Sequence, residues 1–584
     1  MLGPSALFSA CYGNVGSSIY YALGVTAAYA LGLTPLAMLL AGGIFVTTAL
    51  NYAEGTAAIP HAGGASSFAR RAFNETTGFL VGWVQLLNYT ATVAISAYFA
   101  IGYLGVFGQY VPALRLVAEP QWHAAAAVVL TGVLIVINVV GIQESSLVNL
   151  IFALLDLATQ VVLVGLGIWL LLNVPVVIHN VHLGVAPTWP HFLASISIAM
   201  VTYTGIETIS NMSEEVRNPS RAVPKATFAV IAAVLFVSTF LPTIGMSVFP
   251  VHPDGHGAFT TELATRWKDD PVAGIVTFFR PEALAFWAGV WVAILAFTIL
   301  VIATNAGLIG ISRLSYSLAA NDLFPGAFAR LHPKARTPFV SIIVFGIVAA
   351  LLILPAQIDL MASVYSLAAT FAFATAHIAV MRLRFVEPDL RRPFQMPLNV
   401  RLGHAKVPVL SVIGALGIGA VFTQLLFQNI QGSTYIYLGW LAVGGLIFVL
   451  YRWHRKKSLW QPLAVPVPRR PVKATLAPHD SIGVAYEQRV HVGRRQPRQA
   501  LVHVPEEPER TWGERTLATL HTMRNPRRTL ALVGMALCLA IGVSALALDL
   551  STSDPFGVGL GWSPGVLMIA LLVVFLLARG LRGR

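Results

Sequence analysis

Two acidic residues stand inside long apolar stretches of the sequence, where charged side chains are rare. Glu207 follows Gly205-Ile, and Asp156 is the only charged residue between positions 147 and 172. A carboxylate inside a membrane helix costs free energy and by default marks a functional site. We expect Glu207 to exchange a proton, and Asp156 to bind a coupling proton or a sodium ion. The alternatives are that Glu207 only bonds freed backbone N–H groups, and that Asp156 pairs with a base elsewhere.

A glycine- and serine-rich stretch interrupts the uncharged apolar segment that opens the chain. Glycine, asparagine and serine are poor helix formers. Broken backbone at membrane depth is tolerated only where protein or a water-filled cavity receives its free N–H and C=O groups. We therefore predict a discontinuous helix with the substrate site built around it. The candidate binding residues of this stretch are Gly13, Asn14, Gly16, Ser17, Ser18 and Tyr21.

A second apolar segment, residues 192–213, is interrupted about halfway by polar residues and a glycine. It lies five predicted spans after the first. Interrupted segments at corresponding positions of two halves indicate an inverted-repeat transporter whose site lies at the membrane midplane. A half-helix N-terminus there attracts an anion, and facing carbonyls attract a cation or an ammonium group. The alternative is that the glycines only allow close helix packing. The candidate binding residues of this segment are Thr202, Tyr203 and Gly205.

A polar stripe runs along the third apolar segment. Asn88, Thr92 and Ser96 recur every four residues and so share one face of a helix. This face is expected to point into a helix bundle, where it either lines the substrate pathway or joins helices. We take Asn88 and Thr92 as candidate binding residues.

The composition places most of the chain in a lipid bilayer. Of the 584 residues, 56% are hydrophobic and 11% are charged, whereas soluble domains carry about 25% charged residues. The net charge of +13 comes from short basic clusters between apolar runs, and no basic and aromatic cluster indicates a nucleic-acid surface. No signature of a nucleotide, haem or zinc site is found, so we expect no cofactor and no metal. The sequence thus favours a transporter driven by gradients over an enzyme.

Fourteen apolar segments approach the roughly 20 residues that a membrane-spanning helix needs. Lysine and arginine gather in alternate connections, as at Arg70 and Arg71 and again at Arg452–Lys457. The positive-inside rule then puts both termini in the cytoplasm of a multi-pass cell-membrane protein. The predicted spans are 5–30, 35–57, 78–110, 124–141, 147–172, 192–213, 226–249, 283–307, 339–355, 359–381, 407–427, 434–451, 529–549 and 563–580.

The spans divide the chain into three parts. Residues 1–455 hold twelve spans and form the predicted transporter core. Residues 456–528 are rich in arginine, proline and glutamate, which indicates either a basic cytoplasmic linker beside an anionic leaflet or a small regulatory segment. Residues 529–584 hold two additional spans.

Several short motifs follow one another in order along residues 5–455. They include Gly16-Ser-Ser-Ile-Tyr20, Tyr52-Ala-Glu54, Gly205-Ile-Glu207, Glu214-Glu-Val-Arg-Asn-Pro-Ser-Arg-Ala-Val-Pro224, Arg313-Leu-Ser-Tyr316 and Glu387-Pro-Asp-Leu-Arg-Arg-Pro-Phe394. Together they resemble the amino acid–polyamine–organocation superfamily of permeases. The resemblance implies an all-α membrane protein with a LeuT-like core, a five-plus-five inverted repeat.

The resemblance also implies roles for the interrupted segments. An amino acid's carboxylate would meet Gly16 and Ser17, and its amino group would meet carbonyls near Thr202 and Tyr203. Glu207 matches a glutamate that many proton-coupled or exchanging members carry.

Two positions depart from the superfamily's patterns. Ser18 stands where a second glycine is usual, and Asp156 stands where proton-coupled relatives often carry a lysine. A potassium-importing branch resembles this chain at Ser17, Ser18 and Tyr21, but Asn14 replaces its acid. We expect a secondary transporter of amino acids or related amines that works by alternating access and is proton-coupled. The alternatives are a potassium or other cation importer, and a nutrient sensor that signals through residues 452–528.

Overall fold

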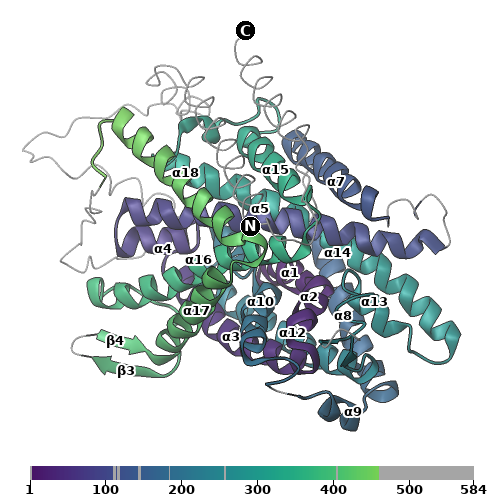
Figure 1. Ribbon diagram of the computed structural model, residues 1–584. Helices are drawn as coiled ribbons and strands as arrows, with labels where there is room; N and C mark the ends of the chain where they lie inside the picture. Colours follow the sequence, from purple (N-terminus) through teal and green to yellow (C-terminus); the bar gives the residue numbers. More distant parts are fainter. Residues whose placement is uncertain are drawn as a thin grey trace, which may run out of the picture. The chain divides into compact units, whose positions relative to one another are not determined.

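The computed structural model describes residues 3–109, 114, 119–141, 146–182, 184–254, 258–402 and 405–459. These residues form helices joined by short connections, with two small antiparallel strand pairs among them (Figure 1). The predicted linker 456–528 lies outside the described residues except for its first four positions. The two predicted C-terminal spans lie wholly outside them.

Ten helical stretches in the described part of the chain are long and apolar enough to cross a membrane. One of them, Pro4–Ala58, is 55 residues long and holds the first two predicted spans. The ninth predicted span is the helix Phe339–Ile353, whose 15 residues make it shorter than the others. Each remaining predicted span up to residue 451 overlaps one stretch.

The N-terminal stretch consists of three α-helices joined by short 3₁₀ turns. Leu31 adopts a φ of 48°, which turns the chain from the second helix into the third. In the middle of the bundle in Figure 1, α2 lies beside α10 and packs against it. The elements are α1 (Pro4–Val15), η1 (Gly16–Ser18), α2 (Ile19–Ala30), η2 (Leu31–Leu33) and α3 (Thr34–Ala58).

Helix α5 (Glu75–Gly105) is the most deeply buried long helix of the bundle. Asn74 caps its first turn, because the Asn74 Oδ1 atom accepts a hydrogen bond from the Thr77 N–H at 2.8 Å. Almost every residue of α5 from Gly78 onward is buried, and α14 (Glu282–Ala320) packs along it. The polar stripe predicted on this helix therefore faces protein.

Helix α14 continues 13 residues beyond the predicted end of its span at residue 307. Leu308, Ile311, Leu314 and Leu318 in this extension are all buried. Their spacing of three to four residues gives the extension one apolar face. Packing against the bundle therefore keeps it helical although it carries Arg313.

The remaining elements complete the bundle and its connections. A hairpin of two short strands extends beside α17 (Figure 1). The elements are α4 (Ala65–Ala72), η3 (Val106–Gln109), α7 (Pro120–Val140), α8 (Ser146–Leu170), α9 (Val174–His179), α10 (Trp189–Ala199), η4 (Met200–Tyr203), α11 (Thr208–Asn211), η5 (Ser213–Glu215), α12 (Pro219–Val248), β1 (His252–Pro253), β2 (Phe259–Thr260), α13 (Pro271–Val276), η6 (Gly326–Ala329), α15 (Phe339–Ile353), α16 (Ile358–Val386), β3 (Asn399–Leu402), β4 (Ala405–Pro408), α17 (Val409–Gln428), η7 (Ile430–Gly432) and α18 (Ser433–His454).

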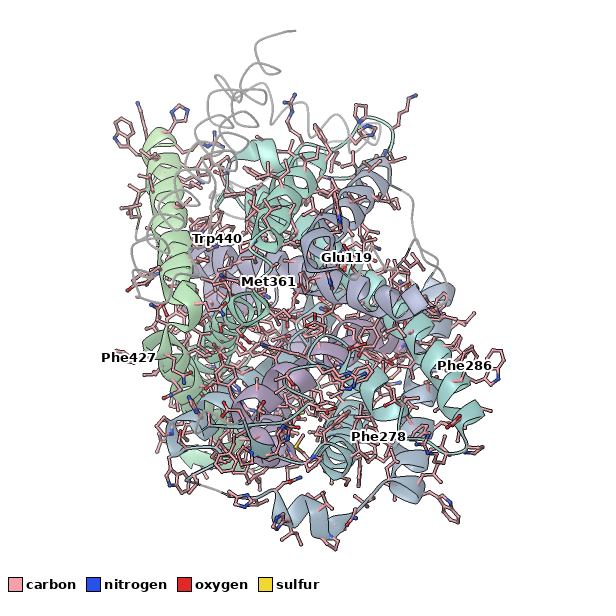
Figure 2. All side chains as sticks on the ribbon, turned by 45° about the vertical axis from the view of Figure 1, so that its right-hand side comes forward. Glu119, Phe278, Phe286, Met361, Phe427 and Trp440 are labelled. Atoms are coloured by element: carbon pink, nitrogen blue, oxygen red, sulfur yellow. The ribbon has the colours of Figure 1, made fainter. Side chains whose placement is uncertain are left out.

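Large apolar side chains cover much of the outside of the bundle. Figure 2 shows Phe427 and Phe286 at its edges and Met361 inside it. Phe427 is 82% exposed, whereas Met361 is fully buried. Exposed apolar residues of this size occur on α7, α8, α12, α14, α17 and α18. Such an extensive apolar surface fits contact with lipid.

Candidate functional site

The sixth predicted span loses its helical backbone at Gly205. Thr204, which follows η4, is extended with a ψ of 154°. Gly205 then has a φ of +106°, a conformation that glycine adopts without the steric cost other residues meet. The helix resumes with α11 at Thr208. The predicted interruption of this span is therefore a real break in the helix.

The first span is interrupted less than we predicted. Its residues Gly16–Ser18 form one 3₁₀ turn, and the flanking Val15 and Ile19 keep right-handed helical angles. The Gly16 N–H donates to the Tyr12 carbonyl, and the Ser17 hydroxyl donates to the Asn14 carbonyl at 3.0 Å. The prediction of a discontinuous helix was therefore too strong for this span. The glycine and the two serines form one turn of the narrower 3₁₀ helix, and the backbone does not unwind.

The two interrupted segments lie against each other. The Asn14 Nδ2 atom donates to the Thr208 Oγ1 atom at 3.0 Å, and the Cys11 Sγ atom lies 3.9 Å from the Gly205 carbonyl oxygen. A Cβ atom on Gly205 would come within 2.8 Å of the Asn14 side chain. The absence of a side chain at Gly205 thus permits both the backbone angle and the close approach of Asn14.

Glu207 lies directly after this break and is fully buried. Its Oε1 atom accepts from the Asn88 Nδ2 atom at 2.7 Å. Its Oε2 atom accepts from the Gly205 N–H at 3.1 Å. The structure thus brings together three of the predicted residues, one from α5 and two from the sixth span. The hydroxyl of Thr92, also predicted, donates to the Asn88 carbonyl within α5 at 3.0 Å.

Asp156 of α8 holds both halves of the first span. Its Oδ1 atom accepts from the Tyr20 hydroxyl at 2.7 Å, and its Oδ2 atom accepts from the Tyr12 hydroxyl at 3.1 Å and from Gln160 at 2.9 Å. Tyr12 and Tyr20 lie four residues before and four residues after Gly16. We did not predict these two tyrosines, although their equal spacing about the glycine was visible in the sequence.

Among the residues that the structure describes, neither of these carboxylates has a charged partner. None of the ion pairs found in the described ranges includes Glu207 or Asp156. Within these ranges Asp156 therefore does not pair with a base, which was the alternative role for this residue. Within the same ranges, no group of three or more histidine, cysteine, aspartate and glutamate residues is placed to hold a metal ion.

Two other predicted residues, Tyr203 and Gly13, pack against α3 and α14. The Tyr203 hydroxyl donates to the Met38 carbonyl of α3 at 2.6 Å, and its ring stacks on Phe45 of the same helix. The Tyr203 side chain is thus fixed by α3. Gly13 packs near Ile299 and Ile302 of α14.

The two remaining predicted residues of the first span interact with each other. The Ser18 and Tyr21 hydroxyls lie 2.8 Å apart, and the Tyr21 ring stacks on Phe99 of α5 with a centroid distance of 5.1 Å. Ser18 is the last residue of the 3₁₀ turn, and Tyr21 lies in the first turn of α2. The resemblance to the potassium-importing branch rests partly on these two residues.

Several buried polar atoms of α1, α3, α5, η4 and α16 have no hydrogen-bond partner among the described residues. Buried polar groups are nearly always bonded to protein or to ordered water. Such atoms are therefore available to a ligand or to water. They are Asn14 Oδ1, Tyr52 Oη, Gln85 Oε1 and Nε2, Asn88 Oδ1, Ser96 Oγ, Thr202 Oγ1 and Tyr365 Oη.

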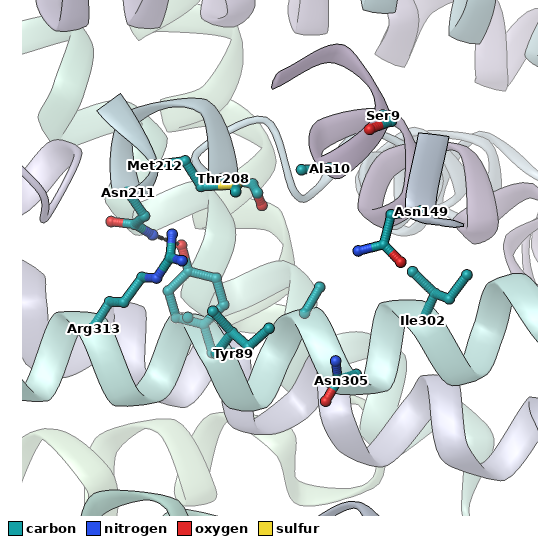
Figure 3. Close-up of a pocket in the computed structure, with 13 residues that line it drawn as sticks. Ser9, Ala10, Tyr89, Asn149, Thr208, Asn211, Met212, Ile302, Asn305 and Arg313 are labelled. Atoms are coloured by element: carbon teal, nitrogen blue, oxygen red, sulfur yellow. Dashed lines mark hydrogen bonds between the residues drawn. The ribbon is translucent and has the colours of Figure 1, made fainter. Parts of the chain in front are cut away.

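A cavity of about 70 Å³ lies beside the break of the sixth span. Figure 3 shows Asn211 and Arg313 at one end of it and Asn149 and Ser9 at the other. Thr208, the first residue of α11, lines the cavity as well. The cavity is large enough for about five water molecules at 10–15 Å³ each. We did not predict it, because its walls come from α1, α5, α8, α11 and α14.

Glu54 is a third buried carboxylate, which we noted only as part of a motif. Its two oxygens accept from the Arg384 Nε and Nη2 atoms at 2.8 and 2.6 Å, and one also accepts from the Met396 N–H at 2.8 Å. This pair joins the end of α3 to the end of α16. The basic cluster after the tenth predicted span was the only signal in the sequence for such a partner.

Residues 2–449 match the family described as amino acid permease. A methylthioribose transporter of Bacillus subtilis (strain 168) is 27% identical over 470 residues, which cover 76% of this chain and 91% of the relative. The branched-chain amino acid permease BcaP of the same organism is 25% identical over 457 residues, covering 76% of this chain and 90% of the relative. The low-affinity putrescine importer PlaP of Escherichia coli (strain K12) is 26% identical over 445 residues, covering 73% and 88%. The chain therefore belongs to the amino acid permease family of the amino acid–polyamine–organocation superfamily and is a multi-pass membrane transporter, not an enzyme.

Proposed function

We propose that this protein is a secondary active transporter that moves amino acids or related amines across the cell membrane by alternating access, coupled to protons. The observation that carries this proposal is Glu207, a fully buried carboxylate that directly follows the Gly205 break and is held by neutral donors alone. A carboxylate in such a place is available to a proton or to a cationic group of the substrate.

The substrate class rests on the site and on the relatives. An unwound segment offers backbone carbonyls to an ammonium group, and the carboxyl oxygens of Glu207 add acceptors beside them. The relatives are named for branched-chain amino acids, putrescine and methylthioribose. An amino or amine group is common to the first two of these cargoes, which favours recognition of that group at the Gly205 break.

Proton coupling follows from the cost of a charged carboxylate inside the bundle. Protonation removes the charge of Glu207, and release of the proton restores it. In this proposal the loaded site changes its access only with Glu207 protonated, so that substrate and proton cross the membrane together and each favours the binding of the other. Asn88 and Gly205 keep the carboxylate in place in either state.

Asp156 is the second proposed coupling residue. Its oxygens are held by tyrosines on both sides of the 3₁₀ turn of the first span. Any movement of α1 relative to α2 has to break one of these hydrogen bonds. Asp156 is thus placed to link the binding of a proton to movement of the first span.

The proposed architecture is that of the LeuT-like fold, which the family implies. The core of residues 1–455 would form twelve spans, of which the first ten form the five-plus-five inverted repeat. Residues 456–528 would be a cytoplasmic linker or small regulatory segment, and residues 529–584 would add two spans. Both termini would then lie in the cytoplasm.

Uptake into proteoliposomes tests the function. Labelled leucine, lysine and putrescine are offered with and without an inward proton gradient. We expect uptake of at least one compound, and we expect the gradient to accelerate it. In Glu207→Gln this acceleration should disappear. The matched control is Glu262→Gln, which makes the same change on an exposed glutamate of the loop after α12 and should behave as wild type. Acceleration that persists in Glu207→Gln would remove Glu207 from the coupling.

The alternative is import of potassium or another cation. A bare cation is best held by carboxylates and other oxygens. At Asn14 the side chain is a neutral amide whose nitrogen donates to Thr208. This favours an amino acid or amine over a bare cation as the substrate. Rescue of potassium-uptake-deficient cells at low potassium would support the alternative, and no rescue with the protein present in the membrane would count against it.

A further inference from the structure

The cavity beside the sixth span contains a guanidinium group that is only partly paired. The Arg313 Nη2 atom lies 2.9 Å from the Glu215 Oε1 atom in an ion pair at the edge of the bundle. The Arg313 Nη1 atom is buried and has no hydrogen-bond partner in the part of the chain that the structure describes. A buried donor without an acceptor costs free energy. This nitrogen therefore has the capacity for one more acceptor at the cavity.

Neighbouring amides keep this end of the cavity in a fixed arrangement. The Asn211 Oδ1 atom accepts from the Gly63 N–H at 3.1 Å, and the Asn211 amide also donates to the Tyr89 hydroxyl. Both Asn211 and Tyr89 line the cavity next to Arg313 (Figure 3). The remaining polar capacity at this end thus comes from Arg313, and the complementary ligand is an anion with acceptor oxygens.

The cavity adjoins the proposed substrate site through Thr208. Thr208 lines the cavity and follows Glu207 directly in the chain, and the Thr208 hydroxyl accepts from Asn14. Acceptor oxygens at the Gly205 break and the guanidinium group of Arg313 together suit a zwitterion that carries an ammonium group and a carboxylate.

We infer that this cavity is a second substrate station, in which Arg313 binds the carboxylate of a transported amino acid. The inference rests on the proposed function and adds a substrate distinction to it. A guanidinium presents a planar set of donors that matches a carboxylate. An amine without a carboxylate gains nothing from this group. Arg313 therefore favours amino acids over the amines obtained by removing their carboxyl group.

The experiment compares matched substrate pairs in proteoliposomes. Lysine is paired with cadaverine, and leucine with isopentylamine, because the members of each pair differ only by the carboxyl group. In Arg313→Gln we expect the KM of the transported amino acid to rise about tenfold to hundredfold, the range for loss of a hydrogen bond to a charged group. The KM of the matching amine should stay within about twofold, which also shows that the variant folds. Arg313→Lys keeps the charge and should restore part of the loss.

Glu215→Gln is the matched control. It removes the same ion pair but leaves the guanidinium in place, and it should leave the KM of both members of a pair unchanged. An equal effect of Arg313→Gln on amino acid and amine, or no effect on either, would overturn the inference. So would a wild-type protein that carries amines but no amino acids, although the proposed function would then still stand. Failure of the wild type to carry any of the four compounds would instead contradict the proposed function.

Discussion

Glu54 and Glu207 are both buried carboxylates, but their partners differ in kind. Glu54 is 1% exposed and meets the guanidinium of Arg384, which is 4% exposed, through two hydrogen bonds of 2.6 and 2.8 Å. Glu207 is fully buried, and its partners among the described residues are neutral, chiefly the amide of Asn88 and the N–H of Gly205. The first charge is neutralised by a fixed opposite charge. The second is stabilised by dipoles alone.

The difference separates two uses of a buried acid. A bidentate arginine pair fixes the geometry of the elements it joins, here the end of α3 and the segment around α16 and Met396. An acid held by neutral groups can lose its charge without leaving an opposite charge unpaired. We therefore assign Glu54 to the stability of the bundle and Glu207 to transport. Three substitutions probe these assignments, from the largest expected effect to the smallest.

Replacement of Arg384 by methionine should be the most damaging of these changes. Removal of one partner of a buried ion pair typically costs about 3–5 kcal/mol. Glu54 would lose both hydrogen bonds from Arg384 and keep the Met396 N–H and the more distant Arg392, whose Nε atom lies 3.8 Å from the Glu54 Oε1 atom. Thermal unfolding of the purified protein in detergent measures the loss. The double variant Glu54→Gln with Arg384→Met should recover part of it. A single variant as stable as wild type would show that the pair does not hold the bundle together.

Substitution of Gly205 by alanine should have an intermediate effect. A left-handed conformation costs an L-residue about 1–2 kcal/mol, and the added Cβ would lie 2.8 Å from the Asn14 side chain. We expect a lower unfolding temperature together with loss of substrate uptake. Gly289→Ala is the control, since its added methyl group would meet nothing within 4 Å. Equal behaviour of the two variants would contradict a special role for the Gly205 break.

Asp270, in the loop before α13, is an acid outside the membrane spans that can be compared with Glu54 and Glu207. Burial, and next the nearby Asp269, raise the pKa of Asp270 from 3.8 to about 7. The folded protein thus binds this proton more tightly than the unfolded chain does. The stabilisation is complete below about pH 4 and is lost as the pH rises to about 7.

Replacement of Asp270 by asparagine should flatten this dependence. Thermal unfolding between pH 4 and pH 8 is the measurement, and the variant should gain stability relative to wild type as the pH rises. The effect is expected to be the smallest of the series because the residue is only partly buried. A wild-type profile that does not fall over this range would contradict the raised pKa.

The sequence anticipated the elements of the site better than its contacts. A glycine among polar residues in an apolar span predicted the break at Gly205, and a period of four predicted that Asn88 faces the bundle. The pairing of Glu54 with Arg384 spans 330 positions, and local patterns do not determine partners at that distance. Tyr203 was predicted to take part in binding through carbonyls of the interrupted segment, and this stays a prediction. No local pattern showed that packing against Phe45 and Met38 would fix the Tyr203 side chain at α3.

The two interrupted spans show the same limit. Both contain glycine among small polar residues, yet only Gly205 takes a positive φ, while Gly16 stays helical. The Tyr12 ring fills the space where a Cβ of Gly16 would lie. The composition therefore predicted an interruption at both positions, and the packing around each glycine determined whether the helix unwound.

Substrate-driven proton movement in proteoliposomes tests the central assignment most directly. A transported amino acid or amine is added outside vesicles that have no initial pH gradient, and a trapped pH-sensitive dye reports the interior. We predict acidification of the interior with wild type and with Glu262→Gln. We predict none with Glu207→Gln, although that variant is expected to remain folded and to exchange substrate. Acidification by Glu207→Gln at the wild-type ratio of protons to substrate would contradict the assignment of Glu207 as the coupling acid.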